Sequence, residues 1–142
     1  MKKITPILLI VLSLAACKKD LRTKIYPLTT YRNSGVFGKL TLVETLDSST
    51  TTVRIEADGL RPNVLYPTYL YQGVIDSITD TLLVFPSFMS GTHNIYREQA
   101  WSIRFDDALK SNACFVMHDT IKPRLYVDSG YVMAGNIGKN GK

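Results

Sequence analysis

The chain has 142 residues, of which 45% are apolar and 20% are charged. This length and composition are typical of one compact globular domain and exclude two full-sized ones. The 17 Lys and Arg residues exceed the 12 Asp and Glu residues and give a formal charge of +5. Because the basic residues are dispersed, and Lys2 and Lys3 lie in a segment that we expect to be removed, the charge does not indicate a nucleic-acid partner.

The first 16 residues have the pattern of a secretion signal. Met1–Lys3 is a short basic start, and Ile4–Ala16 (ITPILLIVLSLAA) is a run of mostly apolar residues. A membrane-spanning helix needs about 20 apolar residues, so this shorter run predicts a signal peptide that is cut off. We therefore assign residues 1–16 to a signal peptide.

The end of this segment resembles a known processing site. Leu14-Ala15-Ala16-Cys17 resembles the bacterial lipobox, in which the Cys thiol is linked to a diacylglyceryl group and the signal is cut before it. The resemblance implies that Cys17 carries lipid, palmitate included, and that the chain is held on a membrane, since each buried acyl methylene contributes about 0.8 kcal/mol. The alternative is an ordinary secretory signal that a Cys follows by chance.

The residues at and after the anchor are predicted to form a tether. Residues 17–26 begin Cys-Lys-Lys-Asp and show no periodic apolar face, which predicts a lipidated Cys and a flexible leader. This opening resembles that of many Bacteroidetes lipoproteins. The resemblance implies a place in the cell envelope, at the outer membrane, either facing the periplasm or exposed on the surface.

The sequence pattern of residues 27–142 predicts a single all-β domain. Gly38–Val43 and Val53–Ala57 alternate apolar and polar side chains around the turn residues Asp47–Thr50, which predicts a hairpin. Pro67 predicts an edge strand or a bulge, and a helical turn is expected only near Asp106–Leu109. Seven to eight short strands favour a sandwich or barrel. The remaining predicted strands are Val64–Tyr71, Thr81–Phe85, Ala100–Phe105, Ala113–His118 and Tyr131–Ile137.

Three motifs carry a resemblance to a family. Val53–Asn63 (VRIEADGLRPN) resembles the strand and Gly-Leu-x-Pro-Gly turn shared by Cu,Zn superoxide dismutases and chordin-type (CHRD) domains. Phe115–Asp119 (FVMHD) is similar to their apolar strand ending in His, and Val132–Gly138 (VMAGNIG) to their closing Ala-Gly-x-Ile-Gly strand. The resemblance spans about Gly38–Gly138 and implies a Greek-key β-sandwich of antiparallel strands.

The same resemblance implies that the dismutase metal ligands are missing. The family turn continues Gly-x-His-x-x-His-x-His, and Leu65, Thr68 and Leu70 occupy the three His positions. The chain has two histidines, of which only His118 matches a ligand position. We expect no metal site, no cofactor and no enzymatic activity, and a partly buried His118 at a strand end. The alternative is residual metal binding by His118 with Asp119.

Tyrosines gather where the dismutases carry their ligands. Tyr66, Tyr69 and Tyr71 follow the turn, and Tyr26 and Tyr31 lie upstream. Tyrosine offers rigid contact area with a polar tip, so Tyr66, Tyr69 and Tyr71 are a candidate surface for an envelope protein or a glycan. The alternative is that these rings only fill the core or cover a sheet.

Two other features have ordinary structural interpretations. Cys114 lies in an apolar run and is expected to be a small buried hydrophobe. The adjacent carboxylates Asp106 and Asp107 are expected at the start of a helical turn, because neighbouring residues point in different directions and do not form a catalytic pair.

Three tripeptides resemble an O-glycosylation acceptor of the Bacteroidetes, Asp followed by Ser or Thr and an aliphatic residue. They place candidate acceptors at Ser77, Thr81 and Thr120. The alternative is turn chemistry, because Asp before Ser or Thr is common in turns.

Two functional classes follow from the sequence. The first is a noncatalytic, lipid-anchored β-sandwich that binds another component of the cell envelope. The second is a degenerate dismutase-like protein that still handles a metal.

Overall fold

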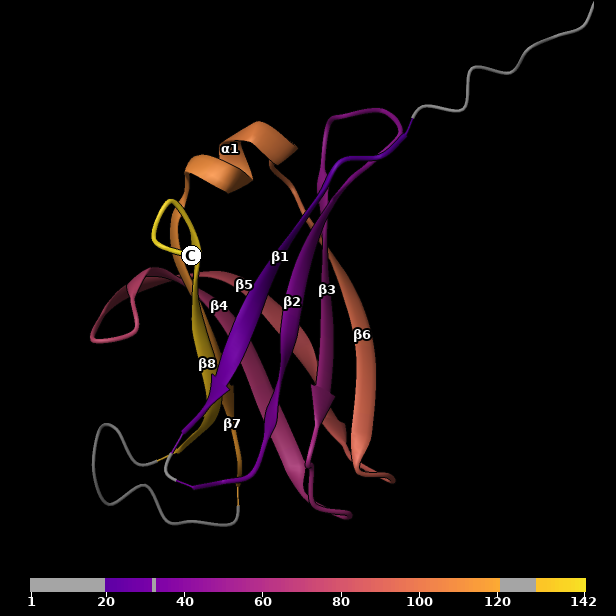
Figure 1. Cartoon of the computed structure of the whole chain (residues 1–142), viewed down its shortest axis with the longest axis vertical. Coiled ribbons are helices and arrows are strands. Elements are labelled where there is room, and N and C mark those ends of the chain that lie inside the picture. The colour runs from indigo at the N-terminus through magenta and orange to yellow at the C-terminus, as the bar shows by residue number, and fades with distance from the viewer. Residues whose placement is uncertain (1–19, 32, 121–129) are drawn as a thin grey trace, which may run out of the picture.

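The computed structural model of the chain describes residues 20–31, 33–120 and 130–142. These residues form eight antiparallel strands and one short helix (Figure 1), which confirms the all-β class and the expected number of strands. The strands are β1 (Thr23–Thr30), β2 (Phe37–Glu44), β3 (Thr51–Asp58), β4 (Leu65–Val74), β5 (Ser77–Met89), β6 (Asn94–Trp101), β7 (Asn112–His118) and β8 (Tyr131–Gly138), and the helix is α1 (Phe105–Lys110).

The strands form one sheet in the order β5-β4-β7-β8-β1-β2-β3-β6. Strand β1 joins its two halves, because Thr23–Leu28 pair with β2 while Thr29 and Thr30 pair with β8. The sheet folds over a shared core, so that β4 and β5 pass behind β2 and β3 (Figure 1). The two end strands, β5 and β6, follow one another in the chain but do not pair with each other. The sheet is therefore open between them.

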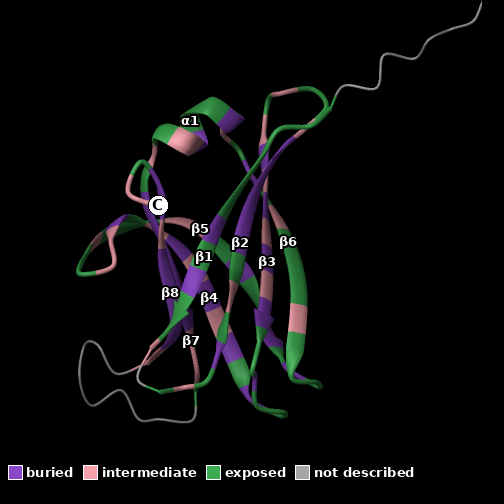
Figure 2. Cartoon of the chain, viewed as in Figure 1, coloured by how far each residue is buried: buried purple, intermediate pink, exposed green. Residues whose placement is uncertain are grey.

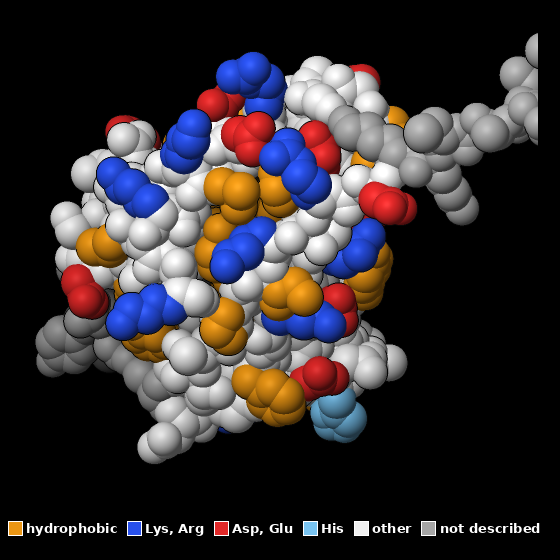
Figure 3. Space-filling model, turned by 45° about the horizontal axis from the view of Figure 1, so that its top comes forward, with side chains coloured by type: hydrophobic (Ala, Val, Ile, Leu, Met, Phe, Trp, Pro, Cys, Tyr) orange, Lys and Arg blue, Asp and Glu red, His pale blue; other side chains and the backbone are white. Residues whose placement is uncertain are grey.

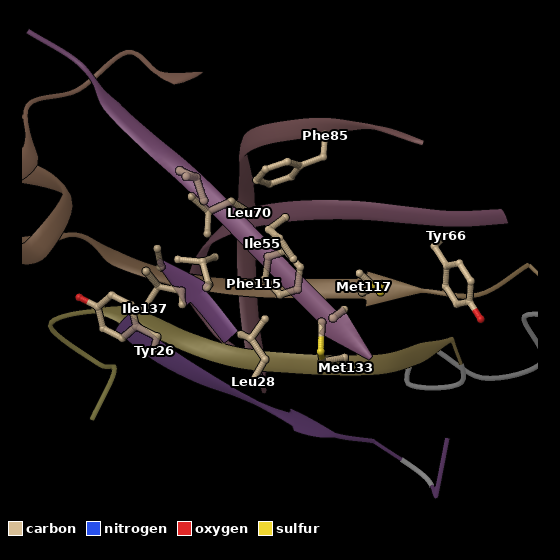
Figure 4. Close-up of a cluster of buried hydrophobic side chains, with 14 of the residues drawn as sticks. Tyr26, Leu28, Ile55, Tyr66, Leu70, Phe85, Phe115, Met117, Met133 and Ile137 are labelled. Carbon is tan, nitrogen blue, oxygen red and sulfur yellow. The ribbon is translucent and has the colours of Figure 1, made fainter. Parts of the chain in front are cut away.

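The core lies between the two halves of the sheet. Val53, Ile55 and Ala57 are buried and alternate with less buried residues along β3 (Figure 2), as expected for a strand with one face in the core. From the other half, Phe115 points toward Phe85, with 6.2 Å between the ring centroids (Figure 4). The alternation of buried and less buried residues along the strands thus determines which side chains meet in the core.

Strands β7 and β8 are buried on both faces (Figure 2). Cys114 and Val116 point away from the core and are nonetheless fully buried, as is Ala134 on the adjacent strand. This explains the continuous apolar run in Ala113–Met117, since a strand covered on both sides has no polar face. The second face must therefore be covered by side chains outside the core.

Two local signals produce the expected turns. Strands β2 and β3 pair along their whole length, from Phe37 opposite Asp58 to Glu44 opposite Thr51, which confirms the predicted hairpin. At the end of β3, Gly59 has a φ of +78°, and a Cβ atom there would overlap the carbonyl oxygen of Gly35. Only glycine fits this turn without strain.

The bounds of β6 and β5 differ most from the predicted ones. The predicted strand Ala100–Phe105 begins at Asn94 and ends at Trp101, because Asn94 and Trp101 pair with the two end residues of β3, Asp58 and Thr51. Phe105 instead begins α1, which confirms the predicted helical turn and buries Phe105 and Ala108 against the core. Strand β5 is longer than predicted at both ends, and its first residues Ser77 and Ile78 pair with β4 rather than form a turn.

A further difference concerns the first strand, whereas Pro67 follows the second of its two predicted alternatives. Strand β1 begins at Thr23, so residues 23–26 belong to the folded domain rather than to the tether. Strand β4 pairs with both β5 and β7, so Pro67 does not lie on an edge strand. It lies at a bulge instead, where the pairing with β5 shifts between Tyr66 and Thr68. The missing N–H of proline is tolerated at such a bulge.

The signal segment and Cys17 lie outside the described residues. Within the described ranges, no helix is long and apolar enough to cross a membrane. The Greek-key connection and the resemblance to dismutases and CHRD domains remain predictions.

Candidate binding surface

The three tyrosines of the predicted surface lie on opposite faces of β4. Tyr69 and Tyr71 are half-buried and point outward, whereas Tyr66 is 1% exposed and belongs to the core. Tyr66 stacks on Phe88, and its hydroxyl accepts a hydrogen bond from the backbone N–H of Arg61 at 2.8 Å. The prediction was therefore wrong for Tyr66, because an even-numbered residue of this strand faces inward and an odd-numbered one outward.

Tyr69 and Tyr71 begin a row of five rings on the outer face of β4, β7 and β8. The rings of Tyr71 and Tyr69 stack with 5.4 Å between centroids, and the edge of Tyr69 meets His118 at 5.8 Å. His118 then meets Tyr131 at 5.0 Å, and Tyr131 meets Tyr31 at 6.0 Å, both edge to face. We call Tyr71, Tyr69, His118, Tyr131 and Tyr31 the aromatic row.

The strand register places the row over a small buried floor. Tyr69 lies opposite Val116, which lies opposite Ala134 on β8, while Tyr71 lies opposite Cys114. Cys114, Val116 and Ala134 are fully buried. Tyr31, Tyr71 and Tyr131 therefore pack on a second hydrophobic cluster outside the main core, and the ring contacts of the row hold Tyr69 and His118 between Tyr71 and Tyr131.

A bulge brings the fourth ring into the row. The register of β7 and β8 shifts after Met117, so that His118 lies opposite Tyr131 rather than Val132. Val132 turns into the main core, and Tyr131 packs on the outer cluster. Such bulges re-aim side chains, and this one makes the row continuous between β7 and β8.

The row continues into an exposed apolar residue on β5. Val84 pairs with Tyr69 and is 57% exposed. Because paired residues of neighbouring strands point to the same face, Val84 extends the outer face of Tyr69 toward the edge of the sheet. Large exposed apolar side chains next to aromatic ones are typical of protein contact surfaces.

The positions that match dismutase ligands do not gather around His118. Thr68 and Leu70 are buried in the core, and Leu65 is 36% exposed on the other face of β4. His118 is half-buried at the end of β7, as expected, with Tyr69 and Tyr131 against its ring. Among the described residues, no group of three or more His, Cys, Asp or Glu side chains could hold a metal ion.

No family model, curated protein or solved structure matches this chain.

The other predicted site residues are accessible or structurally engaged. Ser77, Thr81 and Thr120 are exposed, and the Thr120 hydroxyl donates to the carbonyl of Leu65. The glycosylation of these three residues stays a prediction. Cys114 is buried beneath the aromatic row, and this burial raises the pKa of its thiol to about 11.

The two adjacent carboxylates act in separate ion pairs. Asp106 binds Arg22 at 2.8 Å, and Asp107 binds Arg104 at 3.0 Å. The Arg22 guanidinium also binds Glu44 and holds the pKa of Asp106 below its ordinary value. Because each carboxylate has its own cation, the pair has the structural role that the sequence predicts. On the face in Figure 3, acidic and basic side chains alternate and form no patch of one sign.

Proposed function

We propose that this chain is a lipid-anchored protein of the cell envelope whose β-sandwich is a noncatalytic binding module. Its contact surface is the aromatic row together with Val84. The observation that carries the proposal is the continuity of five rings over a buried floor on the outer face of β4, β7 and β8. A buried cluster outside the main core forms only where side chains cover the outer face of the sheet. Rigid aromatic rings suit a contact surface, because they lose little conformational entropy on binding.

The partner that suits this surface is a protein. Val84 presents methyl groups beside Tyr69, and methyl groups offer no hydrogen bond to sugar hydroxyls. An apolar centre with phenolic hydroxyls around it matches the anatomy of a protein interface. A glycan partner is the other outcome of the tests below.

The anchor places this surface near a membrane. An extended chain spans at most about 3.6 Å per residue, so the six residues from Cys17 to Thr23 reach about 20 Å. The module and its partner would therefore meet within one domain diameter of the lipid surface.

The anchor is tested by Cys17→Ala. We expect this variant to keep its signal peptide, to migrate as the longer precursor and to lose labelling by a clickable palmitate analogue. Labelling that persists in the variant would remove the anchor from the proposal and leave the binding surface untouched.

The surface is tested by quantitative co-purification from the native envelope. Val84→Lys adds a charge beside Tyr69, whereas Leu46→Lys makes the same kind of change in the β2–β3 turn, where Leu46 is 74% exposed. We expect one protein to be depleted at least tenfold with Val84→Lys and retained with Leu46→Lys. Equal recovery with both variants would contradict the proposal, and depletion of a glycan alone would change the class of partner.

A further inference from the structure

A pocket of about 180 Å³ lies where the sheet is open between β5 and β6. Ile55, Phe85 and Met117 form its inner wall and are members of the main core. Phe88 and Ile95, from the two end strands, line it closer to the surface. The opening in the sheet therefore leads from solvent to the apolar interior.

One cation stands at this apolar pocket. Arg97 pairs with Ile55 across β3 and β6, so both side chains belong to the inward face of the sheet. The Cζ atom of Arg97 lies 5.3 Å from the centroid of the Phe88 ring, and its Nη1 donates to the carbonyl of Tyr96 at 3.0 Å. Arg97 forms no ion pair with any residue that the structure describes.

The acidic residue beside the pocket, Glu98, already has partners for its carboxylate. Glu98 accepts a hydrogen bond from Nε of Arg54 at 2.7 Å and another from the hydroxyl of Tyr96. These hydrogen bonds lower the pKa of Glu98 and keep it ionised on the outer face. Arg97 therefore supplies the uncompensated charge at the pocket.

A guanidinium against an apolar wall has a preferred ligand. Arg97 is exposed at the mouth of the pocket, where a ligand can reach it, and a carboxylate binds a guanidinium through two parallel hydrogen bonds. A cavity of about 150 Å³ in another protein holds a benzene molecule. This pocket therefore has room for one aromatic ring, with aromatic walls at Phe85 and Phe88.

We propose that this pocket binds a small carboxylate with one aromatic ring, the ring lying between Phe85 and Phe88 and the carboxylate on Arg97. The site lies apart from the aromatic row, and the inference does not rest on the proposed function. Without a ligand, Arg97 has a second use, because an inward-pointing charge on an end strand discourages pairing with another sheet.

The test uses the protein purified from its native host in detergent, and saturation-transfer NMR. Phenylacetate is the probe, 2-phenylethanol is its uncharged counterpart, and the detergent buffer without protein gives the background. We expect phenylacetate to bind more tightly than 2-phenylethanol. Arg97→Gln should weaken phenylacetate at least tenfold and leave 2-phenylethanol unchanged, while Arg97→Lys, with a point charge, should retain part of the difference.

Two further variants separate the pocket from general electrostatics. Lys24→Gln removes an exposed cation from β1, which does not line the pocket, and should not change phenylacetate binding. Ile95→Phe narrows the pocket and should weaken both probes. The proposal is overturned if phenylacetate gives no signal above the detergent buffer, or if Arg97→Gln and Lys24→Gln weaken its binding equally. Either result would leave Arg97 with only its role in discouraging the end strand from pairing with another sheet.

Discussion

The ring of Tyr66 stacks on the ring of Phe88 inside the core, with 5.7 Å between their centroids. Tyr69, three residues later, lies on the other face of the same strand. We expect Tyr66→Ala to lower the free energy of unfolding by about 3–5 kcal/mol, as large-to-small core changes do. Tyr69→Ala should cost about 1–2 kcal/mol, since it loses two ring contacts at a half-exposed site. Urea denaturation of both variants checks this, and equal losses would refute the assignment of faces.

A second prediction concerns the turn after β3. Gly59→Ala places a methyl group against the carbonyl of Gly35 at a φ of +78°. We expect a loss of at least about 1–3 kcal/mol, because the backbone must leave its left-handed conformation or move away. Gly91→Ala is the matched control, since a Cβ atom at Gly91 meets nothing within 4 Å. Similar thermal unfolding of the two variants would show that the turn is not constrained as described.

The fold could be predicted where local patterns decide it. The alternation of Val53, Ile55 and Ala57 and the turn before them fixed the β2–β3 hairpin, since register follows from which side chains must be buried. Strand β1 (TKIYPLTT) could not be found in this way. Half of its residues are Thr or Lys, it contains Pro27, and its pairing with β2 and β8 depends on residues far away in the chain.

The candidate surface could be predicted only in part, because some of its contacts join residues far apart in the chain. The spacing of Tyr69 and Tyr71 placed them on one face, and the same spacing rule should have excluded Tyr66. Tyr131 joins the row through the bulge between β7 and β8, and Tyr31 through its contact with Tyr131. No local sequence pattern predicts such a contact. The opening between β5 and β6 is likewise a property of the whole sheet.

A third prediction concerns acid stability. Asp47 accepts hydrogen bonds from the Thr45 and Ser49 hydroxyls and from the Ser49 backbone N–H in the β2–β3 turn. These bonds lower its pKa from 3.8 to about 2. A carboxyl whose pKa is lower in the folded state stabilises the fold above its ordinary pKa, and this stabilisation is lost as the pH falls through the folded value. The wild type should therefore melt above Asp47→Ala near neutral pH, and the difference should shrink between about pH 4 and pH 2. A constant difference would contradict the hydrogen-bonded turn.

A fourth prediction concerns the thiol beneath the aromatic row. Cys114 is fully buried and its pKa is raised to about 11, so little thiolate forms at neutral pH. In the lipidated protein we expect iodoacetamide to label no thiol under native conditions and one thiol per chain in urea, counted by intact mass. Rapid native labelling would mean that the floor of the row is open. Two labelled thiols in urea would mean instead that Cys17 is not lipidated.

The most direct test of the binding surface is site-specific photo-crosslinking in the native envelope. Val84 is replaced by p-benzoylphenylalanine in one variant and Leu46 in the other, so that two exposed apolar positions carry the same reactive group. The account predicts a discrete adduct from position 84 that contains a second polypeptide and is absent from position 46. No adduct at position 84, or the same adducts from both positions, would contradict the claim that the outer face of β4, β7 and β8 binds a protein.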